Sequence, residues 1–290
     1  MQILVTGAYG QLGSEIKLLQ ENYPDWEFCF TDVDSLDITN ELAVHDFFSE
    51  NKFDFVVNCA AYTAVDKAES DEQTAHLVNA VAPKILARQA VTAGAKLIHV
   101  STDYVFAGDA CTPYAETDKT NPQGAYGRTK LEGEENVLAE NPNSIVIRTS
   151  WLYSTFGNNF VKTMLRLGKE RGELNVVFDQ IGSPTYAADL AEAILSIIDS
   201  TAKEVKSFVP GIYHFSNEGV ASWFDFALAI FDFARVDCDV KPVLSDQFPT
   251  PTKRPHYSVL DKAKIKNTYG IAIPYWRDSL KECIKRLGDK

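Results

Sequence analysis

The stretch from Tyr126 to Lys130 contains a phenol and an ammonium group four residues apart. On a helix, this spacing places both side chains on the same face. A phenol normally keeps its proton up to a pH of about 10, and a nearby ammonium group favours the phenolate and lowers that value. Such a tyrosine could give a proton to a carbonyl oxygen or take one back. Many pairs with this spacing lie on solvated helix faces, so the chemistry also requires a cofactor site and a substrate site.

A glycine-rich turn follows the first apolar segment of the chain. Its glycines, Gly7, Gly10 and Gly13, have the spacing GxxGxxG. Between a strand and a helix, such a turn lets the backbone approach a pyrophosphate, and the N–H groups at the helix start face the anion. We therefore predict a dinucleotide site that includes Gln11 and Leu12, although a glycine-rich loop without a ligand can have the same pattern.

Asp32 ends the second predicted strand, 19 residues after Gly13. A carboxylate at this place can accept hydrogen bonds from an adenosine ribose and would repel a 2′-phosphate. Asp32 by itself therefore favours NADH. A capping or loop role is the alternative, because other aspartates follow closely, and Asp37 with Ile38 could flank the adenine instead.

The ends of the next two predicted strands complete the proposed site. In a doubly wound sheet, ligands lie across the carboxyl ends of the strands. Small residues after the third strand would let the cofactor cross there, unless they serve only tight packing. The expected contacts are Ala60, Ala61, Tyr62 and Thr63. After the fourth strand, the hydroxyl of Thr102, or else that of Ser101, could hydrogen-bond a substrate carbonyl oxygen beside the phenol. Capping of the turn is the alternative role.

Apolar segments alternate with amphipathic ones along the first half of the chain. The predicted strands are 1–5, 27–31, 53–59, 96–101 and 144–149, and the predicted helices are 11–22, 40–51, 73–93 and 126–139. Near-continuous apolar strands separated by helices indicate a parallel sheet that is covered on both faces. The predicted fold is therefore α/β, a Rossmann-type doubly wound parallel sheet with a smaller α/β substrate lobe.

The pattern loosens after about residue 150 and suggests a division into domains. We assign residues 1–150 to a dinucleotide-binding domain, to which residues 187–216 return. The segments 151–186 and 217–290 are assigned to a sugar-nucleotide substrate lobe.

The composition limits the partners that the protein can have. The chain of 290 residues carries a formal net charge of −12, which argues against non-specific binding to nucleic acid or to an anionic membrane. Its five cysteines include no CxxC motif, so we expect reduced thiols and a cytoplasmic location. We find no signal peptide pattern and no apolar run long enough to span a membrane. The five histidines lack the spacing of a catalytic zinc site.

Taken together, the motifs resemble the extended short-chain dehydrogenase/reductase superfamily, and most closely its branch of dTDP-4-dehydrorhamnose reductases. The superfamily features are the glycine turn with Thr102, Tyr126 and Lys130. The segments that resemble the branch are 58–70, 101–106, 126–134, 148–153, 157–165, 179–185 and 249–258. They span nearly the whole chain, and those in the second half separate this branch from general sugar epimerases.

The resemblance implies that NADPH or NADH reduces the C4 keto group of dTDP-4-dehydro-L-rhamnose. The product would be used to make cell-wall polysaccharide. Tyr126 would protonate the developing alkoxide with the help of Thr102, and Lys130 would lower the tyrosine pKa and hold the nicotinamide ribose. The implied contacts to sugar, pyrophosphate or base are Asp103, Trp151, Asn158, Asn159, Phe160 and Arg254. Core packing is the alternative for Trp151, and a charge on a surface loop is the alternative for Arg254.

Some members of this branch also carry Mg²⁺ at the contact of a homodimer. Glu15 matches the first acidic position, whereas Asp189 stands where the resemblance leads us to expect glutamate. We therefore favour two surface carboxylates over a metal site.

Two other functions remain open because a fold does not fix a function. One is a non-catalytic regulatory subunit resembling that of methionine adenosyltransferase, against which the intact Thr102, Tyr126 and Lys130 set argues. The other is a related sugar-nucleotide epimerase or dehydratase, which would retain its cofactor. A dehydratase usually needs a glutamate directly after Asp103, and this chain has tyrosine there.

Overall fold

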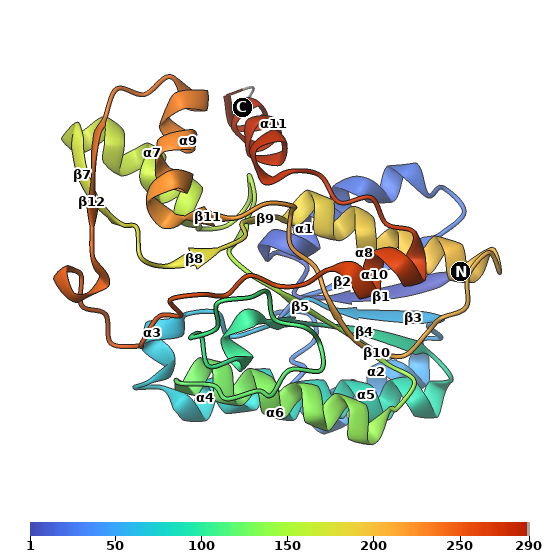
Figure 1. Ribbon diagram of the computed structural model, residues 1–290. Helices are drawn as coiled ribbons and strands as arrows, with labels where there is room; N and C mark the ends of the chain where they lie inside the picture. The colour runs from blue at the N-terminus through green and yellow to red at the C-terminus, as the bar shows by residue number, and fades with distance from the viewer. Residues whose placement is uncertain (289–290) are drawn as a thin grey trace.

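The computed structural model describes residues 1–288, and a six-stranded parallel sheet lies at its centre (Figure 1). The strand order is β10-β5-β4-β3-β1-β2. The bounds are β1 (Gln2–Thr6), β2 (Glu27–Thr31), β3 (Phe55–Asn58), β4 (Lys96–Thr102), β5 (Ile145–Thr149) and β10 (Gly211–His214). The chain moves outward from β1 in both directions, which confirms the predicted Rossmann-type doubly wound sheet.

Helices cover both faces of the sheet, which explains why its strands are apolar almost throughout. One face packs against α1 (Gln11–Leu19), α8 (Ala187–Ala202) and α10 (Ala263–Tyr269). The other packs against α2 (Glu41–Glu50), α5 (Ala82–Ala93) and α6 (Ala125–Glu140). Side chains alternate along β1, so Ile3 and Val5 join the first layer while Leu4 joins the second.

The sequence predicts one long helix over residues 73–93, whereas the structure divides it. The first part is α4 (Glu72–His76), and a wider π-helical turn over Leu77–Val81 connects it to α5. Pro83 explains the change, because it has no N–H to donate to the carbonyl of Asn79 as a regular α-helix requires. The widened turn accommodates the missing bond, and turns of this kind are frequent near functional sites.

A second, smaller α/β lobe lies above and to the left of the sheet in Figure 1. Its helices are α7 (Phe160–Arg171), α9 (Trp223–Ala234) and α11 (Trp276–Gly288), and its parallel strand pair is β7 (Glu173–Val177) with β12 (Asp239–Val243). Two-residue strands connect the halves: β6 (Leu152–Tyr153), β8 (Ile181–Gly182), β9 (Thr185–Tyr186) and β11 (Ala221–Ser222). The short elements are α3 (Val65–Ala68) and 3₁₀ turns at Gln20–Asn22, Asp103–Val105 and Ser245–Gln247. This lobe has its own apolar cluster, which includes Phe226 and Leu280.

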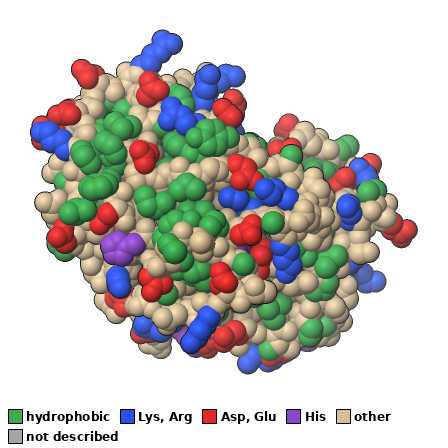
Figure 2. Space-filling view, viewed as in Figure 1, with side chains coloured by type: hydrophobic (Ala, Val, Ile, Leu, Met, Phe, Trp, Pro, Cys, Tyr) green, Lys and Arg blue, Asp and Glu red, His purple; other side chains and the backbone are tan. Residues whose placement is uncertain are grey.

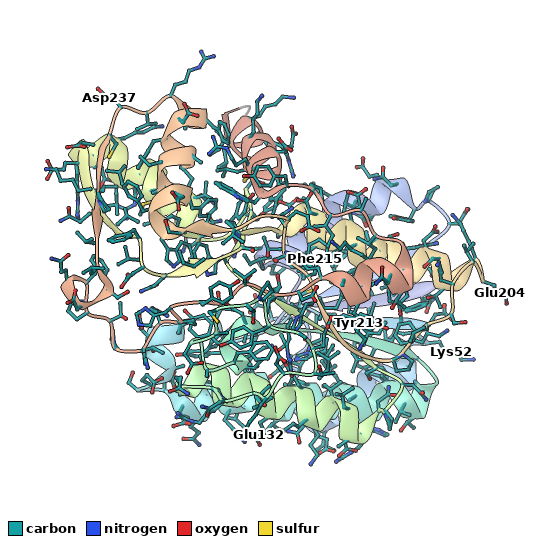
Figure 3. The ribbon with its side chains drawn as sticks, viewed as in Figure 1. Lys52, Glu132, Glu204, Tyr213, Phe215 and Asp237 are labelled. Atoms are coloured by element: carbon teal, nitrogen blue, oxygen red, sulfur yellow. The ribbon has the colours of Figure 1, made fainter. Side chains whose placement is uncertain are left out.

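Several segments of the second half return to the sheet. Strand β10 pairs with β5. Tyr213 on this strand and Phe215 just after it lie buried at the centre of the molecule, whereas Glu204 and Asp237 lie at its periphery (Figure 3). Helix α10 also packs on the sheet through Ile265. The sequence did not predict this helix, because its seven residues are too few for a clear periodic pattern.

The surface shown in Figure 2 carries acidic and basic side chains interspersed, with apolar side chains gathered over the smaller lobe and its border with the sheet. Within residues 1–288, none of the helices has the length and apolar character that crossing a membrane requires.

Candidate active site

A cavity of about 830 Å³ extends along the carboxyl ends of the strands and reaches the smaller lobe. Strand register brings its walls together, because Thr6 is paired with Asn58 and Thr102 with Thr149 at the same edge of the sheet. Its wall includes Gly7 of the glycine turn and Trp223 from α9 of the smaller lobe. Its volume lies within the range of small-molecule and cofactor sites.

The glycine turn requires glycine for reasons visible in its backbone. Gly7 has a φ of +67°, and a Cβ atom there would lie 2.6 Å from the backbone nitrogen of Ala60. A Cβ atom on Gly13 would overlap the carbonyl oxygen of Gly7 and the Cα atom of Ala8. The Gly10 N–H donates to that same carbonyl at 3.0 Å, immediately before α1 begins. The turn is thus compact enough to bring backbone N–H groups up to a bound phosphate.

Asp32 connects the end of β2 to this turn. One carboxylate oxygen accepts from the N–H of Tyr9 at 2.9 Å, and the other accepts from the N–H of Val33 at 2.9 Å. Asp32 also lines the cavity, as do Asp37 and Ile38. The carboxylate therefore has a structural role in the turn besides any contact with a ribose.

The cavity wall contains most of the predicted cofactor residues. They are Gly7, Gly10, Gln11, Leu12, Asp32, Asp37, Ile38, Ala60, Ala61, Thr63, Tyr126 and Lys130. Gly13 and Tyr62 lie outside the wall. Gly13 packs beneath Gly7, in the helix–strand role expected of a third glycine. Tyr62 points elsewhere, because its hydroxyl donates to Asp71 at 3.1 Å and its backbone N–H donates to the Asn79 side chain.

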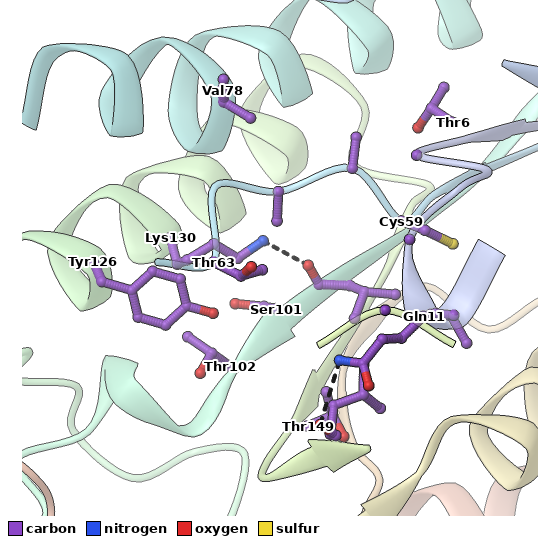
Figure 4. Close-up of a pocket in the computed structure, with 18 of the residues that line it drawn as sticks. Thr6, Gln11, Cys59, Thr63, Val78, Ser101, Thr102, Tyr126, Lys130 and Thr149 are labelled. Carbon is purple, nitrogen blue, oxygen red and sulfur yellow. Dashed lines mark hydrogen bonds between the residues drawn. The ribbon is translucent and has the colours of Figure 1, made fainter. Parts of the chain in front are cut away.

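The predicted proton-transfer residues lie close together in the cavity wall (Figure 4). Tyr126 and Lys130 are on the buried face of α6, with 8% and 1% of their surfaces exposed. The Tyr126 and Thr102 side chains lie side by side in the cavity wall (Figure 4). The Lys130 ammonium group donates to the carbonyl of Val100 at 2.7 Å, and that carbonyl belongs to the same strand as Thr102.

The electrostatics of the pair differ from the prediction. Burial raises the pKa of Tyr126 above its usual value, although the neighbouring Thr102 side chain opposes the shift. Burial also lowers the pKa of Lys130 to about 8, and the negative charge of Glu134 opposes that shift. The expected lowering of the tyrosine pKa is therefore wrong for this structure, because desolvation of the phenol outweighs the favourable groups around it. At neutral pH the phenol keeps its proton, which is the form that a proton donor needs.

Asp103 is buried beside this group. One of its carboxylate oxygens accepts from the Thr102 hydroxyl at 3.0 Å, and the other is buried with no hydrogen-bond partner among the residues that the structure describes. Burial raises the pKa of Asp103 to about 6, while the polar side chains of Ser258 and Thr102 oppose the shift. The free oxygen leaves Asp103 able to accept a hydroxyl group of a ligand.

The predicted substrate residues divide into two groups. Thr102, Asp103, Trp151 and Asn158 line the cavity, whereas Asn159, Phe160 and Arg254 do not. The Asn159 side chain accepts from the Lys162 N–H at the start of α7 and donates to Gln11 at 2.9 Å. Phe160 packs against Trp223, with ring centroids 4.6 Å apart. Both residues support the wall from behind.

Arg254 extends from the proline-rich segment 249–255 to the first half of the chain. Its guanidinium group donates to Asp66 at 2.6 Å and to the hydroxyl of Tyr104 at 3.2 Å. The backbone N–H of Thr252 also donates to Asp66, at 3.2 Å. Arg254 lines a separate hollow of about 600 Å³, beside Lys253. Arg254 therefore forms an ion pair that joins the proline-rich segment to the first half of the chain, and it is not an isolated surface charge.

Glu15 and Asp189 do not fit a divalent metal site. Glu15 is 1% exposed, and its two oxygens accept from Ser154 at 2.6 Å and from Arg286 at 3.1 Å. One oxygen of Asp189 accepts from Asn217 and Ser279, each at 2.5 Å. Residues 1–288 contain no group of three acidic, histidine or cysteine side chains that could hold a metal ion. The interpretation as surface carboxylates is also wrong for Glu15, because the Arg286 cation neutralises it inside the protein.

Sequence reasoning missed several residues of the cavity wall, and Trp223 is the largest of them. It lies at the start of a helix rich in aromatic residues, and nothing in that pattern separates it from the core aromatics. Cys59 also lines the cavity, where burial raises the pKa of its thiol to about 12. Tyr104 contacts the edge of the Tyr126 ring, with centroids 5.5 Å apart.

Several known proteins are similar to this chain in sequence and in fold. The family profile described as the RmlD substrate binding domain matches residues 1–288. A dTDP-4-dehydrorhamnose reductase of Aggregatibacter actinomycetemcomitans is 42% identical over 288 residues, covering 97% of each chain. A solved reductase of the same name from Clostridium acetobutylicum is 49% identical and superposes with a TM-score of 0.94, covering 99% of this chain and 100% of its own. Another, from Bacillus anthracis in complex with NADP, is 39% identical with a TM-score of 0.92, covering 98% and 99%.

Proposed function

The chain belongs to the RmlD substrate-binding family, and we propose that it reduces the C4 keto group of dTDP-4-dehydro-L-rhamnose to give dTDP-L-rhamnose, with NADPH or NADH as the reductant. The observation that carries this proposal is that one cavity is lined by all three groups that the reaction needs. They are the glycine turn with Asp32, the Tyr126 phenol, and Trp151 with Trp223.

The residues of the cavity suit a keto reduction. The bound nicotinamide cofactor supplies the hydride. As charge develops on the C4 oxygen, Tyr126 gives its proton to that oxygen, so the phenol O–H bond breaks while the O–H bond of the product hydroxyl forms. Thr102 lies beside the phenol in the same cavity wall, where its hydroxyl can hydrogen-bond the C4 oxygen. The buried Lys130 cation, 1% exposed, stabilises the phenolate that remains.

In this proposal, the two parts of the chain bind different ligands. We assign the dinucleotide to residues 1–150 with 187–216, and the sugar nucleotide to the lobe of 151–186 and 217–290. The packing of α8 against α1 and the pairing of β10 with β5 agree with the return of the middle segment. Helix α10 belongs to the substrate-lobe range but rests on the sheet. A cytoplasmic location and a homodimer remain predictions from the sequence.

The purified protein is expected to oxidise NADPH, and also NADH, when it is given dTDP-4-dehydro-L-rhamnose. The loss of nicotinamide absorbance measures both rates under the same conditions. Asp32 does not forbid NADPH, because its oxygens already accept two backbone N–H groups of the turn region. Absence of oxidation with either cofactor would refute the reductase proposal. Tight cofactor retention without net consumption would indicate an epimerase, and recovery of a synthetase with no sugar turnover would indicate a regulatory subunit.

Removal of divalent cations is expected to leave this activity unchanged. Arg286 and Ser154 occupy the oxygens of Glu15, so a cation would have to displace a buried ion pair in order to bind there. The measurement is the reductase rate with excess EDTA against EDTA saturated with Mg²⁺. A rate that falls with EDTA and returns with Mg²⁺ would contradict this expectation and place a metal site elsewhere.

A further inference from the structure

Trp151 and Trp223 form a flat indole pair at the substrate end of the cavity. Their ring centroids are 3.5 Å apart and their planes differ by 7°, so the two rings lie face to face. Both residues line the same cavity as Thr102 and Tyr126. They come from distant parts of the chain, since Trp151 follows β5 and Trp223 is the first residue of α9.

The backbone of Trp151 is in an uncommon conformation. Its φ is +49°, in the left-handed region that a bulky residue rarely adopts. Such a conformation persists only where the surrounding structure enforces it, and it is enriched at ligand sites. Two backbone contacts hold the segment: the Trp151 carbonyl accepts from the Thr185 N–H at 3.2 Å, and the next residues form β6, which pairs with β9.

The short sheet of β8 and β11 positions the rest of the pair. Ala221 is paired with Gly182 in the antiparallel register of these strands, and α9 with Trp223 begins directly after β11. A Cβ atom on Gly182 would lie 2.6 Å from the Trp151 indole, so glycine is needed for the ring to fit. The Trp223 ring then stacks on that indole.

The start of α9 fixes the position of Trp223. Ser222 and Asp225 form a reciprocal capping box, in which the Ser222 side chain accepts from the Asp225 N–H at 3.0 Å and the Asp225 carboxylate accepts from the Ser222 N–H at 2.9 Å. Phe160 packs against the Trp223 ring from α7. Trp223 therefore has a rigid support on its own helix and a second one on the neighbouring helix.

From this arrangement we propose that Trp223 is a positioning residue for the sugar: it holds Trp151 in its left-handed conformation, so that the stacked indoles form the wall against which the pyranose ring is placed for hydride transfer. An aromatic surface can pack against the C–H groups of a sugar ring. The inference rests on the proposed function, because it assigns the sugar end of that reductase cavity.

Trp223→Ala is expected to raise the KM for dTDP-4-dehydro-L-rhamnose about tenfold or more, because a small displacement of a positioning wall has large kinetic effects. The KM for NADPH should change less than about twofold, since Trp223 belongs to the smaller lobe and not to the glycine turn. Trp223→Phe keeps an aromatic ring and should show a smaller rise. The matched control is Phe224→Ala, the next residue of α9, which lies outside the cavity wall and should leave both KM values near wild type. Equal rises in both KM values, or no rise for the sugar nucleotide, would overturn the proposal.

An optical signal tests the pair without turnover. Two indoles stacked face to face couple their transitions and give a paired band in circular dichroism. Trp151→Phe and Trp223→Phe should each abolish this band, whereas Trp26→Phe in the first half should keep it. Titration with dTDP-L-rhamnose should change the band, and NADPH alone should not.

If the wild type fails to oxidise NADPH but the band still responds to dTDP-L-rhamnose, the proposed reaction fails and the positioning role stands. A band that survives either Trp151→Phe or Trp223→Phe, or that ignores the sugar nucleotide, overturns the positioning role.

Discussion

Tyr126→Phe is expected to lower kcat by about 10²–10⁴-fold while the Kd for NADPH stays near the wild-type value. The variant removes only the hydroxyl that carries the transferable proton. The ring remains, so its edge contact with Tyr104 and its place on the buried face of α6 are kept. Steady-state kinetics with dTDP-4-dehydro-L-rhamnose measure the loss, and quenching of protein fluorescence by NADPH measures the affinity.

Tyr62→Phe is the matched control for that experiment. The same hydroxyl is removed, but Tyr62 lies outside the cavity wall and its hydroxyl donates to Asp71. The control should keep turnover within about twofold of wild type, as expected for a change that touches no reacting atom. If Tyr126→Phe retained similar turnover, the phenol would not be the proton donor. The buried and partly unpartnered Asp103 would then be the group to test next.

The protonation state of the pair adds a second expectation for the wild type. Since burial raises the pKa of Tyr126, the phenol does not lose its proton near neutral pH. Of these two groups, Lys130 titrates nearer to neutrality, because burial lowers its pKa to about 8. Its positive charge is present below that pH and is lost as the pH rises through it. A decline of the rate in that range therefore reports the lysine and not the tyrosine.

The amino-acid sequence contained enough to predict the sheet and the middle of the cavity. Strands such as Phe55–Asn58 are buried on both faces, so their apolar runs have a single explanation. Tyr126 and Lys130 lie four residues apart on one helix. Their shared face can therefore be predicted from the sequence without information about the rest of the fold. The glycine turn is likewise local, because the requirement at Gly13 comes from Gly7 and Ala8.

What could not be predicted depends on residues far apart in the chain. Trp223 becomes part of the wall only because Gly182 and Trp151 meet it in space. Arg254 finds its partner in Asp66, 188 residues away. The direction of the Tyr126 pKa shift depends on how completely the fold removes water from the phenol, and a spacing of four residues says nothing about that burial.

A buried ion pair behind the active site gives the largest expected effect on stability. Arg148 of β5 and Glu134 of α6 are 2% and 1% exposed, and their closest contact is 2.6 Å. The Ser101 hydroxyl also donates to Glu134, and the Arg148 guanidinium lies 4.9 Å from the centroid of the Phe106 ring. The pair therefore joins α6, which carries Tyr126, to the strands that it covers.

Arg148→Met is expected to lower the free energy of unfolding by about 3–5 kcal/mol, because it leaves the buried Glu134 carboxylate without its paired guanidinium group. Urea denaturation followed by circular dichroism measures the loss.

The double variant Arg148→Met with Glu134→Leu should recover most of the lost stability, since an apolar replacement of the whole pair removes the unpaired charge. The control is Arg88→Met, which breaks surface pairs with Glu41 and Glu140 in which Arg88 is 44% exposed, and it should cost no more than about 1 kcal/mol. Equal losses for Arg148→Met and Arg88→Met would mean that burial does not set the strength of these pairs. If the double variant were as unstable as Arg148→Met, the loss would come from packing against Phe106 and not from an unpaired charge.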